Sequence, residues 1–152
     1  MGDFTYKISC MKILFICKSN IGRSPAAAFF FNARSKKHYA VSAGIRDVEE
    51  HEREIKNIPS AENTIQSFLK YGCDLSNFNR RQVTEAICND ADKIYVLMET
   101  HEKDIPEYIK NNAKVIFHPF TNGKELQGEE RENLTKDIKQ FAEDLADSLD
   151  NE

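Results

Sequence analysis

The feature that most constrains the fold of this chain is a short apolar run that leads, through a polar loop, directly into an Ala-rich segment. The run spans residues 11–17 (MKILFIC) and has the length and apolar composition of a buried strand. The Ala-rich segment 25–37 (PAAAFFFNARSKK) is too long for a strand and predicts a helix. A second strand is predicted at 39–43, ended by Gly44. This strand–helix–strand order indicates parallel strands.

The rest of the chain continues the alternation. Its next predicted elements are two helices and two strands, over residues 60–72, 81–89, 93–98 and 113–117. Ser60 is expected to cap the first of these helices and Gly72 to end it. A long amphipathic helix follows, because apolar residues recur on one face at Leu134, Ile138, Phe141, Leu145 and Leu149. The charged stretch 46–57 predicts a surface loop or an exposed helical turn. We therefore expect a single-domain α/β fold with a doubly wound, four-stranded parallel sheet and helices on both faces.

Length and cysteine content argue against several classes of protein. With 152 residues the chain fits one domain, and its 40% of hydrophobic residues suffices for a core. No apolar run approaches the roughly 20 residues of a membrane-spanning helix, and the first residues do not resemble a secretory signal. The four cysteines, at positions 10, 17, 73 and 88, lack the C-x2-C spacing of a zinc ribbon. Reduced thiols and a cytoplasmic location are therefore expected.

The predicted domain spans residues 11–152, and residues 1–10 precede it as an N-terminal extension. The extension is either non-native, with Met11 as the biological start, or it adds an edge strand over residues 4–8. Both alternatives stay open on the sequence.

The net charge of −4 conceals an uneven distribution of charged residues. No Asp or Glu occurs from Phe4 to Arg46, a stretch with eight Lys and Arg residues. Residues 125–152 instead carry ten acidic residues and three basic ones. The charges either coat exposed helices without further purpose, or they mark a basic front that binds an anion.

The loop 17–24 (CKSNIGRS), between the first strand and the first helix, is the candidate anion site. Ligands of doubly wound sheets bind beyond the carboxyl ends of the strands, where the strand order reverses. We expect Ser24 to cap the helix and Pro25 to be its first residue. Free backbone N–H groups and the positive end of the helix dipole would then face a phosphate-like dianion.

Several side chains of this loop suit the same chemistry. Gly22 allows a tight turn, and the positive potential favours the thiolate form of Cys17. Arg23 can offer a planar, bidentate fork, and the Ser24 hydroxyl can donate to the thiolate. Each has a structural alternative: a Cys at a strand end is most often a small buried residue, and Asn20 is a common turn residue. The C-x5-R spacing is weak alone, but its place between a strand and a capped helix favours the functional interpretation.

Four segments together resemble the low-molecular-weight protein tyrosine phosphatases, a family that includes thioredoxin-coupled arsenate reductases. They are the signature loop FICKSNIGRSP (15–25), VSAGI (41–45), YGCDLSNFNRR (71–81) and NDADKIYVLMETH (89–101). The resemblance extends over nearly the whole chain from Met11 on. It implies the doubly wound fold of that family.

The resemblance also implies a role for each loop residue. Cys17 is the nucleophile that forms a cysteinyl-phosphate, and Ser24 assists its thiolate. Asn20 and Ser42 hold the loop in shape through hydrogen bonds. Phosphoryl oxygens are bound, and the transition state stabilised, by Arg23 and the loop amides. The expected phosphate-binding residues are Lys18, Ser19, Asn20, Ile21, Gly22 and Arg23.

The implied partners are a phosphorylated protein or a small phosphoester, with inorganic phosphate or another oxyanion as ligand of the loop. The resemblance implies no metal or organic cofactor, and neither a nucleic acid nor a membrane as partner.

The chain departs from the family pattern at the general acid. The family supplies this acid from an Asp-Pro dipeptide after the fourth strand, and the chain contains no Asp-Pro. The matching position reads His118-Pro119-Phe120. Phe120 keeps an aromatic wall for the substrate. His118 is either an imidazolium that protonates the leaving group or a polar loop residue of a weak catalyst.

Two further positions differ. Gly22 stands where many members carry a second Cys, so a protective disulfide with the nucleophile is absent. Phe78 stands where the family has a His, which removes one polar partner of the loop.

Two other functions would use the same loop. Arsenate reduction needs two further Cys after the third strand, and residues 98–101 (METH) contain none. Cys73 and Cys88 lie earlier and are expected to be buried small residues, while a route through Cys10 or a small thiol stays open. The other function is that of a phosphate-binding pseudo-phosphatase, which the missing Asp favours and the intact C-x5-R loop opposes.

Overall fold

The computed structural model describes residues 10–55, 59–99, 103–123 and 126–152. In these residues one parallel sheet is built, in the order β2-β1-β3-β4, from β1 (Lys12–Cys17), β2 (Tyr39–Gly44), β3 (Lys93–Val96) and β4 (Val115–Phe117). The predicted doubly wound, four-stranded parallel sheet is confirmed. The possible edge strand over 4–8 lies outside the described residues.

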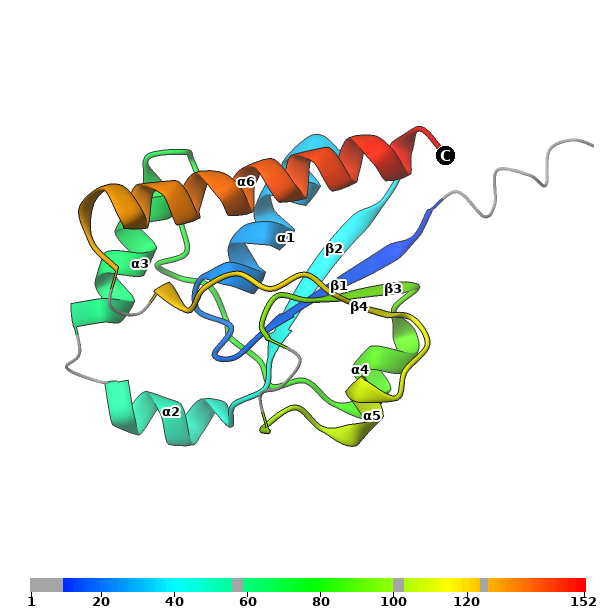
Figure 1. The fold of residues 1–152 in the computed structure, drawn as a ribbon, viewed down its shortest axis with the longest axis horizontal. Helices are drawn as coiled ribbons and strands as arrows, with labels where there is room; N and C mark the ends of the chain where they lie inside the picture. The colour runs from blue at the N-terminus through cyan, green and yellow to red at the C-terminus, as the bar shows by residue number, and fades with distance from the viewer. Residues whose placement is uncertain (1–9, 56–58, 100–102, 124–125) are drawn as a thin grey trace, which may run out of the picture.

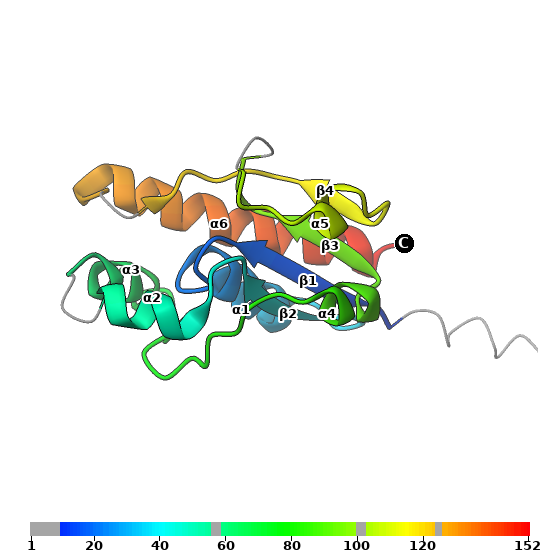
Figure 2. The same ribbon diagram turned by 90° about the horizontal axis from the view of Figure 1, so that it is seen from below.

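Helices cover both faces of this sheet (Figures 1 and 2). The described helices are α1 (Arg23–Arg34), α2 (Val48–Ile55), α3 (Pro59–Leu69), α4 (Glu85–Asp90), α5 (Glu107–Lys110) and α6 (Gly128–Asp150). Side chains of β1 alternate between the faces: Ile13 and Phe15 pack in the core with α1, α3 and α6, and Leu14 and Ile16 in the core with α4 and α5. The carboxyl ends of the strands point toward α2 and α3 (Figures 1 and 2). Of the described helices, none has both the length and the apolar composition needed to cross a bilayer.

The first helix begins earlier than predicted, and the prediction that Ser24 caps it is wrong. Helix α1 starts at Arg23, and its N-cap, Gly22, makes no side-chain capping bond. Ser24 lies in the first turn, where its hydroxyl contacts the Cys17 thiol instead of a backbone N–H. Ser24, a residue type that commonly caps helices, therefore contacts the Cys17 sulfur instead.

Two further helix starts differ. Residues 81–83 are not helical, because Gln82 bridges to Gly44 and α4 begins only after Thr84, whose side chain accepts from Ile87 N. Helix α3 begins at Pro59, so Ser60 is a helical residue and not the cap. The charged stretch 46–57 contains α2, the helical alternative of the two that the sequence allowed.

Candidate active site

The loop 17–24 lies at the carboxyl end of the central strand β1, which has β2 on one side and β3 on the other. The loop stays attached to the continuation of β2, because Ile45 N donates to Cys17 O (3.0 Å) and Arg46 N to Lys18 O (2.9 Å). The first α1 bond, from Ala26 N to Gly22 O (2.9 Å), closes the other end. The loop is therefore anchored at both ends at the strand-order reversal, where the sequence predicted an anion site.

Cys17 lies at the base of this loop, 2% exposed. Its Sγ is 3.0 Å from Ser24 Oγ and accepts a hydrogen bond from Asn20 N (3.3 Å). Ser24 Oγ itself accepts from Asn20 Nδ2 (2.8 Å), and its own proton can be donated to Cys17 Sγ or to Ala43 O (3.4 Å). The Ser24 hydroxyl and the Asn20 N–H therefore both contact the sulfur that would act as the nucleophile.

Asn20 is fully buried and connects the loop to its surroundings. Its φ of 56° is the one positive value among the described non-glycine residues, and Asn tolerates this region better than most residues. Besides Ser24, its Nδ2 donates to Ser42 Oγ (2.9 Å), and its Oδ1 accepts from Arg81 N (3.0 Å). The hydrogen bonds expected of Asn20 and Ser42 are therefore present.

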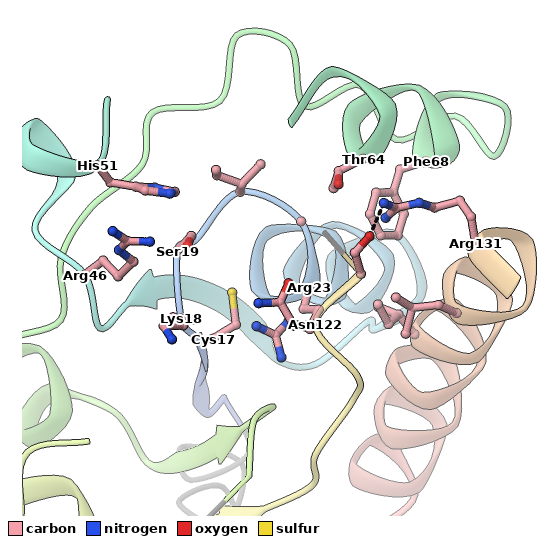
Figure 3. Close-up of a pocket in the computed structure, with 15 residues that line it drawn as sticks. Cys17, Lys18, Ser19, Arg23, Arg46, His51, Thr64, Phe68, Asn122 and Arg131 are labelled. Atoms are coloured by element: carbon pink, nitrogen blue, oxygen red, sulfur yellow. Dashed lines mark hydrogen bonds between the residues drawn. The ribbon is translucent and has the colours of Figure 1, made fainter. Parts of the chain in front are cut away.

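Arg23 is held with its guanidinium beside Cys17 (Figure 3). Its Nη1 donates to Leu97 O (3.2 Å) and to Phe120 O (2.9 Å), the backbone that follows β3 and β4. Among the described residues no acceptor takes up Nε or Nη2, so the rest of the fork is left for a ligand. A guanidinium oriented in this way can bind two oxygens of a phosphoryl group.

Two residues that support the loop were missed by the sequence reasoning. Arg80 donates from Nε and Nη2 to Ser19 O (3.0 and 2.9 Å). Arg81 donates from Nε to Ser42 O (3.0 Å), in addition to its N–H bond to Asn20. The family-like segment 71–81 contains both, and the family's pattern places its arginine at Arg81, which was the available signal; nothing in that pattern distinguishes Arg80 from an exposed arginine.

Two glycines allow the close approaches on which the loop depends. A Cβ on Gly44 would lie 2.9 Å from Asn20 N, so only glycine lets β2 approach the loop. A Cβ on Gly22 would lie 2.5 Å from Thr64 Cγ2 of α3. A side chain at position 22 would therefore require the loop or Thr64 to shift.

A cleft opens above the loop, and Figure 3 shows the side chains around it. It is lined by Cys17, Lys18, Ser19, Ile21, Gly22 and Arg23 of the loop, and by Arg46, His51, Thr64, Phe68, Asn122, Gly123, Arg131, Leu134 and Ile138. Asn20 belongs to the loop but is fully buried and does not line the cleft. The lining includes four Lys and Arg side chains and, among the described residues, no Asp or Glu. Such a lining is suited to a multiply charged anion.

Comparison with known protein families shows to which family this chain belongs. Residues 12–151 match the family of low molecular weight phosphotyrosine protein phosphatases. The chain belongs to this family. A comparison with curated protein sequences gives no match.

Solved structures of the family share the fold at low sequence identity. Wzb from Vibrio vulnificus in complex with benzylphosphonate is 22% identical, with a TM-score of 0.71 over 91% of this chain and 98% of that chain. An arsenate reductase from Archaeoglobus fulgidus is 22% identical, with a TM-score of 0.66 over 89% and 98%. A mutant of the arginine phosphatase YwlE with a phosphorylated active-site serine is 17% identical, with a TM-score of 0.70 over 91% and 95%. At these identities the likeness shows the fold.

The family's acid position is not brought next to Cys17. The His118 ring stacks on Phe141 of α6, with ring centroids 4.2 Å apart. Together with Phe120 it lines a different surface hollow, beside Asp137 and Asp144. Although the residue is exposed, partial burial of the ring lowers the pKa of His118 below its ordinary value. Phe120 reaches the site only through its carbonyl group, which accepts from Arg23.

The remaining thiols do not approach the nucleophile. Cys73 and Cys88 are fully buried in the two cores on opposite faces of the sheet. Burial raises the pKa of the Cys73 thiol to about 12 and also raises the pKa of Cys88. Their predicted role as buried small residues is confirmed, whereas Cys10 is exposed.

Potential metal ligands are scattered in the described part of the chain. There, no three His, Cys, Asp or Glu side chains lie close enough to hold a metal ion.

Proposed function

We propose that this protein hydrolyses phosphomonoesters of the phosphotyrosine type through a cysteinyl-phosphate on Cys17. The observation that carries the proposal is the arrangement of Cys17 Sγ, Ser24 Oγ at 3.0 Å and the Arg23 fork within one loop. The Cys17 thiolate attacks phosphorus, the S–P bond forms, and the P–O bond to the leaving alcohol breaks. Water then cleaves the S–P bond, which releases phosphate and restores the thiolate.

Charge stabilisation in the first step is assigned to the loop. The N–H groups of residues 18–23 and the free part of the Arg23 fork bind the three equatorial oxygens, whose negative charge grows in the transition state. The Ser24 hydroxyl donates to Cys17 Sγ when sulfur leaves in the second step. Removal of one such preorganised donor typically costs about 10²–10³-fold in rate.

Protonation of the leaving group is the weak point of the proposed reaction. His118 as general acid remains a prediction, and it would require the ring to leave Phe141, on which it stacks. Without an acid in place, we expect slow turnover that is fastest with good leaving groups, since general acid catalysis contributes about 10²–10⁴-fold.

Arsenate reduction is the less favoured function. It needs a further thiol that can form a disulfide with Cys17 after arsenate has reacted there. Both Cys73 and Cys88 are buried, and burial raises the pKa of each thiol. Arsenate-dependent consumption of reduced thioredoxin would nevertheless establish it, and loss of that activity in Cys73→Ala or Cys88→Ala would identify the thiol.

The test is turnover of p-nitrophenyl phosphate by wild type, Cys17→Ser and Arg23→Lys, with Cys10→Ser as a matched cysteine control. We expect Cys17→Ser to lose at least about 10³-fold in kcat and Arg23→Lys about 10²-fold, with the control unchanged. Acid quenching should trap one phosphate per wild-type chain on cysteine. Phosphate binding without any turnover by wild type would instead identify a pseudo-phosphatase.

The natural substrate requires a parallel comparison. Phosphotyrosyl and phosphoarginyl peptides of one sequence separate the two phosphoresidues that relatives of this fold process. We expect the phosphotyrosyl peptide to be preferred. The guanidinium group of phosphoarginine would need an acidic partner, and no described Asp or Glu lines the cleft.

A further inference from the structure

The cleft continues past the phosphate loop into a region between α3 and α6 that the proposed reaction does not use. Phe68, Leu134 and Ile138 form an apolar wall there. In Figure 3 Arg131 lies in this region, beside Thr64 and Phe68 and apart from Cys17. An apolar wall that carries one guanidinium suits a ligand with an apolar body and an anionic end.

Arg131 is buried, with 8% of its surface exposed. Its Nε donates to Leu126 O (3.3 Å) and its Nη2 to Gly123 O, while Nη1 has no acceptor among the described residues. No fully buried side-chain nitrogen or oxygen in this part of the chain lacks a partner, so Nη1 is not fully buried. Because Arg131 lines the cleft, Nη1 is the donor that a ligand there could use.

The charge of Arg131 is also uncompensated within the described residues. The neighbouring cations of α6 pair with acids one turn away, Lys136 with Glu132 (3.9 Å) and Lys139 with Glu143 (3.0 Å). Arg131 has no carboxylate within 4.0 Å in the described chain, although its helix is rich in acids, and burial lowers its pKa. Burial of a cation is costly unless a counter-charge pairs with it, and an anion bound in the cleft would supply one.

We propose that Arg131 binds a second anionic group of the substrate, a carboxylate or phosphate joined to the reacting phosphoryl group by an apolar spacer. The proposal rests on the phosphatase function proposed above. The reacting phosphoryl group binds at loop 17–24 and Arg23, the spacer packs against Phe68 and Leu134, and Arg131 receives the second charge. Arg131 is in this sense a specificity residue and not a catalytic one.

The experiment compares phosphonates that differ only in a carboxylate. The pairs are phenylphosphonate with 4-phosphonobenzoate, and benzylphosphonate with 4-(phosphonomethyl)benzoate, which probe two distances. Dissociation constants are measured by calorimetry for wild type, Arg131→Gln and Arg131→Lys. Arg34→Gln serves as the charge-matched control, because Arg34 pairs with Asp147 away from the cleft.

We expect wild type and Arg34→Gln to bind the carboxylated member of at least one pair about tenfold more tightly, as one charge-assisted hydrogen bond allows. Arg131→Gln should bind both members equally, with unchanged affinity for the member that lacks the carboxylate. If Arg131→Gln does not fold, Arg131→Lys decides, because it keeps the charge but should lose most of the preference with the planar fork. Equal binding of all pairs by wild type, or a preference that survives in both variants, overturns the proposal.

Failure of this proposal and failure of the phosphatase function have different signatures. A carboxylate preference without p-nitrophenyl phosphate turnover keeps the second anion site and removes the enzyme, whereas turnover without the preference removes only Arg131's role. The source of the anion is resolved with phosphotyrosyl peptides that carry Glu or Gln next to the phosphotyrosine, bound to Cys17→Ser. A Glu preference that depends on Arg131 identifies an acidic peptide, and its absence beside the phosphonate preference identifies a small dianionic ester.

Discussion

Asn20 and Ser42 are 22 residues apart in the chain and are joined by a hydrogen bond of 2.9 Å from Nδ2 to Oγ. The same amide nitrogen donates to Ser24 Oγ at 2.8 Å. One buried group therefore links strand β2, the strained turn of the anion loop and the hydroxyl next to the nucleophile. The shape of the loop and the environment of Cys17 are consequently set together.

Replacement of Asn20 should impair catalysis more than folding. Asn20→Ala loses the bonds to Ser24 and Ser42, leaves Arg81 N without its acceptor, and replaces Asn at φ 56° by a residue that adopts positive φ less readily. Because Ser24 Oγ and the loop lose the amide that orients them, we expect kcat/KM for p-nitrophenyl phosphate to fall about 10²-fold, as on loss of one preorganised donor. Asn20→Gly is the control, because it tolerates the same φ. If Asn20→Gly matches wild type, the network is not needed for catalysis.

Enlargement of Gly22 should be harmful, and a change in α3 should relieve the harm. The Cβ of Gly22→Ala would meet Thr64 Cγ2 at 2.5 Å, so the loop or α3 must shift. We expect phosphate affinity to fall about tenfold and the free energy of unfolding by about 1–3 kcal/mol. The double variant with Thr64→Ser removes that methyl group and should recover most of both losses. Lack of recovery would show that position 22 needs glycine for its backbone and not for space.

The sequence was sufficient to predict the fold and the position of the loop, because both depend on local patterns. Local hydrophobic pattern and composition predict the strand at 11–17, the helix after it and the later strands, and the structure has an element at each of these places. Boundaries were less predictable. Ser24 has the composition of a cap, but contact with Cys17 Sγ outweighs capping. Residues 81–83 contain helix formers, but pairing with Gly44 holds them extended.

Tertiary contacts around the loop could not be predicted from spacing. Arg80 donates to Ser19 O, 61 residues away in the chain. Arg131 lies in a helix rich in acidic residues, where the sequence would predict a surface ion pair, but it lines the cleft. His118 was assigned to the acid position by its order in the chain. Side-chain direction in a loop depends on packing, and here the ring packs on Phe141.

His118→Gln should change turnover little if the His118 ring stays stacked on Phe141 during the reaction. We expect kcat for p-nitrophenyl phosphate and for phenyl phosphate to stay within about twofold of wild type, because the ring does not line the cleft of Cys17. Both enzymes should favour the nitrophenyl ester strongly, since leaving-group protonation contributes about 10²–10⁴-fold when an acid is present. A larger loss with phenyl phosphate than with the nitrophenyl ester would identify His118 as the acid after all.

Alkaline stability should depend on the buried thiol of Cys73. Burial, assisted by the charge of Asp74, raises its pKa from 9.0 to about 12. Between these values the unfolded chain loses the proton and the folded chain keeps it. The stability contributed by the neutral thiol is therefore fully present below pH 9 and lost as the pH rises toward 12.

Urea unfolding at pH 7, 9 and 10.5 should show a smaller alkaline loss of stability in Cys73→Ala than in wild type, although the variant is less stable at pH 7. Cys10→Ser, which changes an exposed thiol, should follow wild type. An equal alkaline loss in Cys73→Ala and wild type would assign the effect to other groups, such as the raised pKa of buried Tyr95.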